Sequence, residues 1–342
     1  MYKVATIGAR GYTGLEFVRL VATHPKFQLK TVVSSDASWK VSKEFPYLPR
    51  LADVETVNNE KFAELADDFD IIVMALSAQQ SFEWKRKLKN FSGVLLDLSG
   101  AFRLDQKGAR EYYQLELSEE ESSVDLYGLR PFQKNNESKL VSNPGCYPTS
   151  VLCPLIPLLK EKIIKSDQII IDAKSGVTGA GRTPKEITHF HEIGSNLVPY
   201  KVGNHQHVPE IERFASYFSG REDSLSIRFT TTLVPLSRGI LSTLYLKLEN
   251  GVGEKEVTAA YEKEFSAEKL INFQKLERGG SVSLKKVVGS PMVDINYYIE
   301  GDNLTIFSCI DNLEKGAASQ AIENLNIRFN LPAHTGLIHT EL

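Results

Sequence analysis

The first half of the chain alternates short apolar runs with segments whose apolar residues recur at helical spacing. The run FDIIVMAL at 69–76 is almost wholly apolar, as expected for a strand buried on both faces. Elsewhere, Leu15, Val18 and Ala22 lie three or four residues apart and so share one side of a helix. Strands that alternate with helices predict βαβ units on a parallel sheet. The expected strands are 3–7, 29–33, 69–76 and 94–98, and the expected helices are 15–23 and 77–90.

The second half of the chain has a different order of elements. After a predicted helix at 150–160, strand-like runs follow one another with one clear helix, 254–268, among them. This order predicts an α+β domain, with a mixed or antiparallel sheet and helices on one face. Polar stretches at 118–125 and 134–138 predict surface loops. The expected strands are 168–174, 225–234, 241–248, 292–299 and 304–309, and a last helix, 313–329, is expected to return to the first domain.

The composition is that of an ordinary globular protein and argues against several classes. The 342 residues suffice for two domains, and a net charge of −3 gives no basic field for nucleic acid. No apolar run is long enough to span a bilayer, and the strand-like start at 2–7 leaves no room for a signal peptide. Three cysteines, an odd and low number, argue against a disulfide framework and fit a reducing cytoplasm.

A glycine-rich turn, GARGYTG at 8–14, joins the first predicted strand to the first predicted helix. A turn in this position typically binds the pyrophosphate of a dinucleotide at the helix N-terminus, and helix capping alone is the other explanation. The spacing here is GxxGxxG rather than the usual GxGxxG. The predicted cofactor contacts in the turn are Gly8, Arg10, Gly11, Tyr12, Thr13 and Gly14.

The end of the second predicted strand bears on the choice between NAD and NADP. An NAD-binding fold usually carries an acid there, about 20 residues past the glycines. This chain has Ser34 and Ser35, whose hydroxyls suit a 2′-phosphate that a carboxylate would repel, and Lys40 adds positive charge. The pattern therefore favours NADP, and Asp36 is the feature that speaks against it.

Cys146 has the surroundings of an activated nucleophile. It follows a Pro-Gly turn and precedes a predicted helix, and Pro148 suits the first turn of that helix. Main-chain N–H groups and the helix dipole favour an anion at this end of a helix, so a thiol there tends to ionise near neutral pH. A thiolate attacks carbonyl carbon, and the same N–H groups would stabilise the resulting oxyanion.

Two histidines, His205 and His207, are candidate proton partners for this thiol. At i and i+2 of an extended segment they would share one face, so either one is a candidate general acid or base. The same spacing suits a metal site, with Glu210 or the pair His189 and His191 as further ligands, which is the less favoured alternative. The arginines that suit bidentate binding of carboxylate or phosphate are Arg103, Arg182 and Arg238.

Several motifs spread along the chain carry a resemblance to a known family. The chain is similar to the N-acetyl-gamma-glutamyl-phosphate reductases, which are relatives of the aspartate-semialdehyde dehydrogenases. The combination of NPGCYPT with HxHxPEI is specific, whereas the glycine turn alone is not. The matching stretches are GARGYTG at 8–14, DLSGAFR at 97–103, NPGCYPT at 143–149, SGVTGAGR at 175–182, HQHVPEI at 205–211, RGI at 238–240 and DNLEKGAA at 311–318.

The resemblance implies roles for individual residues. Cys146 would be the nucleophile and His205, the first histidine of its pair, the general acid or base. Two departures from the family pattern affect the 2′-phosphate contacts and the substrate-side edge: Trp39 precedes Lys40 where glycine is usual, and Arg130-Pro131 stands where Pro-Glu is usual. The implied substrate contacts are Arg103, Asn143, His207, Glu210 and Arg238, and the implied cofactor contacts beyond the glycine turn are Ser34, Ser35, Ser77, Ser175, Gly176 and Asn312, with the last on the nicotinamide carboxamide.

The resemblance also implies a Rossmann-type domain, a reaction and an assembly. Residues 1–146 with 313–342 would bind the dinucleotide, and 147–312 would form the catalytic domain. The implied reaction is the NADPH-dependent reduction of N-acetyl-glutamyl 5-phosphate to the semialdehyde in arginine biosynthesis, through a cysteine thioester and with no metal. The protein would be a cytoplasmic homodimer or homotetramer. Aspartyl phosphate and N-acetyl-aminoadipyl phosphate remain alternative substrates, and a non-catalytic NADP-binding sensor is the alternative of another class.

Overall fold

A computed structural model describes residues 1–36, 38–133, 137–221 and 225–338. The predicted loop 134–138 therefore lies partly outside the described residues. The chain divides into two compact units. Unit 1 consists of Met1–Gly145 with Ala317–Leu342, and unit 2 is Cys146–Gly316.

Unit 1 is built on a six-stranded sheet in which every neighbouring pair is parallel, as the alternation of strands and helices predicts. The order β3-β2-β1-β4-β5-β6 is that of a doubly wound fold, whose strand order reverses between β1 and β4. The strands are β1 (Tyr2–Ile7), β2 (Phe27–Val33), β3 (Glu55–Val57), β4 (Ile71–Met74), β5 (Val94–Asp97) and β6 (Leu140–Ser142).

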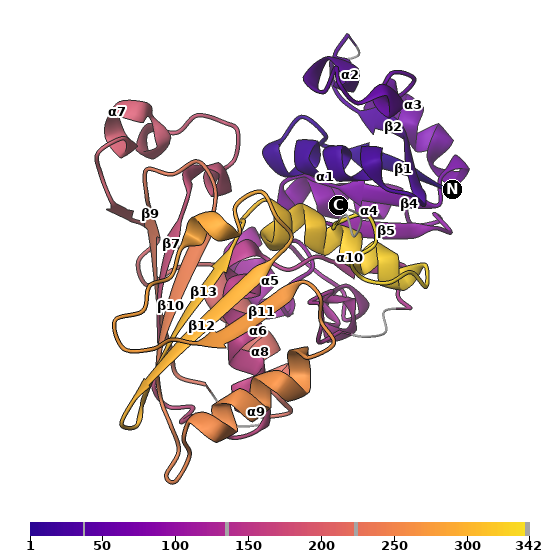
Figure 1. The fold of residues 1–342 in the computed structure, drawn as a ribbon. Helices are drawn as coiled ribbons and strands as arrows, with labels where there is room; N and C mark the ends of the chain where they lie inside the picture. Colours follow the sequence, from indigo (N-terminus) through magenta and orange to yellow (C-terminus); the bar gives the residue numbers. More distant parts are fainter. Residues whose placement is uncertain (37, 134–136, 222–224, 339–342) are drawn as a thin grey trace. The chain divides into compact units, whose positions relative to one another are not determined.

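Both faces of this sheet are buried. Along β4, Ile71 and Val73 pack in one apolar cluster with helices α1 and α10, while Ile72 and Met74 pack in a second cluster with α3 and α4. This explains why the β4 segment reads as a continuous apolar run rather than as an alternating one. The helices are α1 (Tyr12–Thr23), α2 (Val41–Glu44), α3 (Asn59–Leu65), α4 (Ala78–Lys87), α5 (Gln106–Tyr113) and α10 (Ser319–Arg328), as labelled in Figure 1.

The glycine turn lies where the strand order reverses. Gly8 follows β1 with a φ of +84°, a conformation that favours glycine, and a Cβ atom there would collide with the main chain of Ala75 just after β4. A Cβ on Gly14 would collide with the carbonyl oxygen of Gly8. At Gly11 the nearest atom to such a Cβ would be 3.7 Å away, an ordinary contact. Gly8 and Gly14 are therefore required for the close packing of strand, turn and helix.

Unit 2 contains a seven-stranded mixed sheet of order β11-β12-β13-β10-β7-β9-β8. Three neighbouring pairs at its centre are antiparallel: β12 with β13, β13 with β10, and β10 with β7. Two pairs further out are parallel: β7 with β9, and β11 with β12. The strands are β7 (Ile169–Ser175), β8 (Val198–Pro199), β9 (Ile227–Leu233), β10 (Ile240–Lys247), β11 (Ile271–Lys275), β12 (Val293–Glu300) and β13 (Asn303–Ile310).

Helices cover one face of this sheet (Figure 1). The apolar helix α6 (Cys146–Lys160) packs on β10, β12 and β13, and it also contacts α8 (His207–Ser219) and α9 (Glu254–Phe265). A short helix, α7 (Phe190–Ile193), lies in the excursion between β7 and β8. The other face carries half-exposed side chains that alternate with buried ones, such as Ile170 between Ile169 and Ile171 on β7.

The structure corrects one sequence interpretation of consequence for the site. His205 and His207 do not lie in an extended segment, because His207 is the first residue of α8. The apolar residues Ile211, Phe214 and Ala215 form the buried side of this helix at helical spacing, and Pro209 is compatible with its first turn.

Strand β11 was not expected from the sequence. The last predicted helix divides into a π-helical turn (Glu314–Ala318) followed by α10.

No helix among the described residues is both long enough and apolar enough to cross a membrane.

The two glycines of the turn give a matched pair of variants. We expect Gly14→Ala to lower the free energy of unfolding by about 1–3 kcal/mol, because the new methyl group has to displace main chain. Gly11→Ala should lower it by less than about 1 kcal/mol, since the added atom meets open space or ordinary contacts. Denaturant unfolding of both variants measures the difference. Equal stability of the two would show that the turn does not need glycine at position 14.

Candidate active site

Cys146 is the first residue of α6 and is partly accessible to solvent. The residue therefore lies at the helix end whose free main-chain N–H groups and dipole favour an anion, which is the position that the sequence predicts. Gly316 packs directly against it, and a Cβ atom on this glycine would lie 2.8 Å from the Cβ of Cys146. Gly316 was not predicted as a site residue, although it lies within the DNLEKGAA stretch.

Two tyrosines adjoin the cysteine and are joined through their hydroxyls. Tyr200 donates a hydrogen bond to the hydroxyl of Tyr147 over 3.1 Å. Burial is the largest influence on both groups, and it raises the pKa of Tyr147 well above its usual range and that of Tyr200 to about 12. The Cys146 side chain acts electrostatically on both in the same direction. Both phenols are therefore neutral near pH 7 and serve as hydrogen-bonding groups rather than as bases.

The same two tyrosines border His205. Their ring centroids lie 5.5 Å (Tyr147) and 5.7 Å (Tyr200) from the imidazole centroid, and Phe229 approaches to 5.6 Å. The main-chain N–H of His207 donates to Nδ1 of His205 over 3.2 Å, so the neutral ring carries its proton on Nε2. Burial first, and the charge of Lys201 second, lower the pKa of His205 to about 4. Near pH 7 the imidazole is neutral and offers Nε2–H as a donor.

His207 and Glu210 lie one turn apart at the start of α8. The two side chains are buried, and His207 Nε2 lies 4.0 Å from a carboxylate oxygen of Glu210. The two imidazole centroids, of His205 and His207, are 4.8 Å apart. The structure therefore brings His205, His207 and Glu210 together, although a helix start rather than an extended segment does so.

Arg238 is held by a buried carboxylate, Asp311. Its Nε lies 3.0 Å from Asp311 Oδ2, and its Nη2 lies 3.2 Å from Oδ1. The next residue, Asn312, accepts the main-chain N–H of Gly239 over 2.7 Å and donates to the hydroxyl of Thr178 over 3.0 Å. Asn312 thus fastens the loop that carries Arg238 to the loop after β7.

Ser175 and Gly176 lie at the end of β7, within this same network. Ser175 is buried and its hydroxyl donates to the carbonyl of Gly176 over 3.0 Å. A Cβ atom on Gly176 would come within 2.8 Å of the main-chain nitrogen of Arg238, so the two loops touch closely only because this residue is glycine.

Arg103 and Asn143, two predicted substrate contacts, lie in unit 1. Both are buried, and Arg103 donates to the carbonyls of Asn143 and Leu98 over 2.8 and 2.9 Å. The Asn143 side chain donates to the carbonyl of Ala317 and accepts from Asn324. These bonds fix the backbone three residues before Cys146 in the sequence. A direct role in binding substrate stays a prediction for both.

A cavity of about 200 Å³ opens beside the glycine turn in unit 1. Four of the predicted cofactor contacts line it, among them hydroxyl and guanidinium donors that suit phosphate groups, and the glycine turn lies next to it. The residues therefore fit a dinucleotide. Ser77 acts locally, as the N-cap that accepts from Gln80 at the start of α4. The predicted cofactor contacts that line the cavity are Gly8, Arg10, Ser34 and Ser35. Three further lining residues, Asn59, Gln80 and Trp84, were not predicted from the sequence.

The other candidates from the sequence lie elsewhere. Arg182, His189 and His191 are exposed in the excursion between β7 and β8. Within the part of the chain that the structure describes, no group of three or more histidine, cysteine, aspartate or glutamate side chains is arranged to hold a metal ion.

Comparisons with known proteins match both units. Residues 3–139 match the family description "Semialdehyde dehydrogenase, NAD binding domain", and residues 146–312 match "Semialdehyde dehydrogenase, dimerisation domain". An N-acetyl-gamma-glutamyl-phosphate reductase of Halothermothrix orenii is 39% identical over 98% of both chains. One of Staphylococcus aureus is 37% identical, again over 98% of both chains.

Solved structures share the fold at low sequence identity. Aspartate semialdehyde dehydrogenase II of Vibrio cholerae superposes with a TM-score of 0.72 at 14% identity, over 96% of this chain and 98% of that one. The Candida albicans enzyme, solved with NADP, gives a TM-score of 0.67 at 15% identity, over the same shares. These two matches show the fold, and the relatives of higher identity with the two family descriptions show that the chain belongs to the family of N-acetyl-gamma-glutamyl-phosphate reductases, a family of oxidoreductases.

Proposed function

We propose that this protein reduces N-acetyl-glutamyl 5-phosphate to N-acetyl-glutamate 5-semialdehyde with NADPH and releases phosphate. The observation that carries the proposal is that Cys146, at the start of α6, and a neutral His205 with an Nε2–H donor lie beside the same two tyrosines. Both side chains belong to one unit of the protein. The family of the chain supports the same reaction.

The first step is acyl transfer to the cysteine. The Cys146 thiolate forms a bond to the acyl carbon, the bond from this carbon to the phosphate oxygen breaks, and phosphate leaves with the electron pair. The product is a thioester on Cys146. Main-chain N–H groups at the start of α6 stabilise the negative oxygen of the tetrahedral state. The thioester accepts hydride more readily than a carboxylate would, and for this reason the reaction needs the cysteine.

The second step is reduction of this thioester. The bound NADPH supplies a hydride to the acyl carbon. His205 Nε2–H donates a hydrogen bond to the carbonyl oxygen as this oxygen gains charge. The oxygen then re-forms the C=O bond, the C–S bond breaks, and the aldehyde leaves with Cys146 again a thiolate. The buried position of His205, which is 4% exposed, limits competition from water at this oxygen.

We assign cofactor and substrate to the two parts of the chain by the predicted division. Residues 1–146 with 313–342 bind NADPH through the glycine turn and the cavity beside it, which Arg10, Ser34 and Ser35 line. Residues 147–312 bind the acyl phosphate, with Arg238, His207 and Glu210 in the substrate pocket. Ser175, Gly176 and Asn312 hold the nicotinamide in this proposal. Ser77 contacts the cofactor, and Arg103 and Asn143 contact the substrate, as the resemblance implies. The three cysteines are in no disulfide, which agrees with the proposed place in the cytoplasm.

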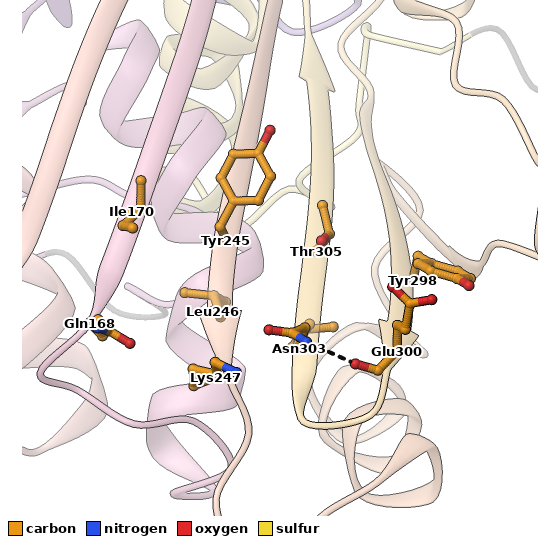
Figure 2. A pocket seen from close by; sticks show the side chains of 10 residues that line it. Gln168, Ile170, Tyr245, Leu246, Lys247, Tyr298, Glu300, Asn303 and Thr305 are labelled. Carbon is orange, nitrogen blue, oxygen red and sulfur yellow. Dashed lines mark hydrogen bonds between the residues drawn. The ribbon is translucent and has the colours of Figure 1, made fainter.

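We propose that the protein is a homodimer that pairs through the open face of the unit 2 sheet. A row of side chains crosses four neighbouring strands there, and Tyr245 is opposite both Ile170 and Thr305 in the register. Thr305 is in turn opposite Tyr298. Figure 2 shows these side chains on the face turned away from α6, where they border a hollow of about 370 Å³. Partly exposed apolar side chains in one row are typical of an interface, and the matched description of this unit names dimerisation.

The reaction and the substrate are tested together in a steady-state assay. The assay runs in reverse, with phosphate and NADP or NAD, on the semialdehydes of N-acetyl-glutamate, N-acetyl-aminoadipate and aspartate. We expect kcat/KM to be highest for N-acetyl-glutamate 5-semialdehyde with NADP. One methylene is worth about 10- to 200-fold in a fitted pocket, so the ranking is measurable. Cys146→Ser should abolish turnover and still bind NADPH. A different preferred aldehyde, or activity in Cys146→Ser, would contradict the proposal.

Alanine variants distinguish the roles of the two histidines in turnover. His205→Ala removes the Nε2–H donor, and we expect kcat to fall by about 100- to 1,000-fold. His207→Ala keeps the main-chain N–H that orients His205, so kcat should fall by about tenfold or less. Steady-state kinetics under saturating substrate measure both. The reverse order would assign the proton-holding role to His207.

The proposed dimer face is tested by a charge at its centre. Tyr245 is 48% exposed in the single chain, so Tyr245→Lys should fold and leave a monomer, because an unpartnered charge would be buried on association. Tyr47→Lys is the control, since Tyr47 is 69% exposed in unit 1. Sedimentation velocity gives the mass of each. A dimeric Tyr245→Lys variant would place the interface elsewhere.

A further inference from the structure

An ion pair stands at the end of β2, next to the cavity proposed for the dinucleotide. Arg10 Nη1 lies 3.7 Å from Asp36 Oδ2, and the two side chains are 49% and 45% exposed. Arg10 lines the cavity together with Ser34 and Ser35, and all these residues belong to unit 1. The cation that a 2′-phosphate would use is therefore already in contact with a carboxylate of the same chain.

The carboxylate of Asp36 is fixed rather than mobile on its side chain. Its Oδ1 accepts the main-chain N–H of Ser38 over 3.0 Å and the Ser38 hydroxyl over 2.6 Å. These two bonds, with a smaller contribution from Arg10, hold the pKa of Asp36 below its usual value, so the group is charged at neutral pH. Its own main-chain N–H donates to the hydroxyl of Ser34 over 3.1 Å. Asp36 is thus built into the turn that follows the two serines.

These contacts give Asp36 two effects on an incoming cofactor. A 2′-phosphate beside Ser34 and Arg10 has to compete with a fixed carboxylate for the guanidinium, and it also meets the negative charge of that carboxylate. A cofactor with a 2′-hydroxyl meets neither cost. The serines therefore favour NADPH, while Asp36 acts against it.

We propose that Asp36 is a specificity-determining residue that limits the preference for NADPH and leaves NADH as a usable cofactor. The proposal rests on the proposed function only in taking a nicotinamide dinucleotide as the ligand of this cavity. Since both side chains are about half exposed, water and salt screen the interaction. The expected effect of Asp36 on the ratio of the two affinities is therefore about two- to fivefold.

The test measures binding directly, without acyl phosphate. NADPH and NADH are titrated into the full-length protein at low salt, and the fluorescence of the reduced nicotinamide reports the dissociation constants. We expect Asp36→Asn to raise the NADPH-to-NADH affinity ratio by about two- to fivefold, and the gain should shrink as salt is added. Asp53→Asn, which removes an exposed carboxylate elsewhere in unit 1, is the control and should leave the ratio unchanged.

Arg10→Gln provides the second variant. It should lower the affinity for NADPH and leave that for NADH nearly unchanged, because it removes the cation that the 2′-phosphate needs. An unchanged or lowered ratio in Asp36→Asn would overturn the proposal, as would an unchanged ratio in Arg10→Gln. Failure of the wild-type protein to reduce any acyl phosphate would overturn the proposed reaction alone, since the binding ratios do not depend on it.

Discussion

The carboxylate of Asp311 has no exposure to solvent, and the geometry of the candidate site in unit 2 depends on how its charge is satisfied. It binds the Arg238 guanidinium and accepts main-chain N–H groups from Gly289, Leu313 and Glu314. A buried charge is tolerated only when its hydrogen-bonding capacity is met in this way. These bonds start the turn after β13 that brings Gly316 against Cys146, and they hold Arg238 in place. One residue therefore links the position of the proposed nucleophile to that of a proposed substrate ligand.

A second constraint is the exclusion of water from His205. Aromatic rings on several sides and a main-chain donor on Nδ1 keep the imidazole neutral and present one defined hydrogen-bond donor, Nε2–H. A neutral imidazole suits a reaction in which the carbonyl oxygen is negative only briefly. The hydroxyl pair of Tyr147 and Tyr200 connects the segment that carries this histidine to the helix that carries the cysteine. The arrangement thus favours hydride transfer to a thioester over its loss to water.

Much of the fold could be predicted because its signals are local. Alternation of apolar runs and helical spacing predicted the parallel sheet of unit 1, and a series of strands predicted the mixed sheet of unit 2. The place of Cys146 at a helix start was predicted from its own surroundings, a Pro-Gly turn before an apolar run, and its role as nucleophile stays a prediction. The start of α8 at His207 was missed because two histidines, a valine and a proline carry little helical signal, whereas the buried Ile211 and Phe214 that fix the helix come later in the sequence.

The parts of the site that could not be predicted depend on contacts between distant residues. Tyr147 and Tyr200 are 53 positions apart, and only the fold brings their hydroxyls within hydrogen-bond distance. The clamp from Asn312 to Thr178 spans 134 positions. Gly316 could have been suspected, since a glycine in an otherwise helical stretch often marks a close approach, but its neighbour could not have been named. Arg103 was proposed from its residue type and from the resemblance, Asn143 from the resemblance alone, and the structure adds that both hold main chain.

The central claim is that Cys146 carries the acyl group as a thioester before reduction, and trapping this species tests it most directly. Wild-type protein is mixed with N-acetyl-glutamyl 5-phosphate in the absence of dinucleotide, and released phosphate and the mass of the intact chain are followed over time. The account predicts a rapid release of phosphate stoichiometric with subunits and an added N-acetylglutamyl group that peptide mapping places on Cys146. Phosphate release that requires NADPH, or an acyl group on any other residue, would contradict it.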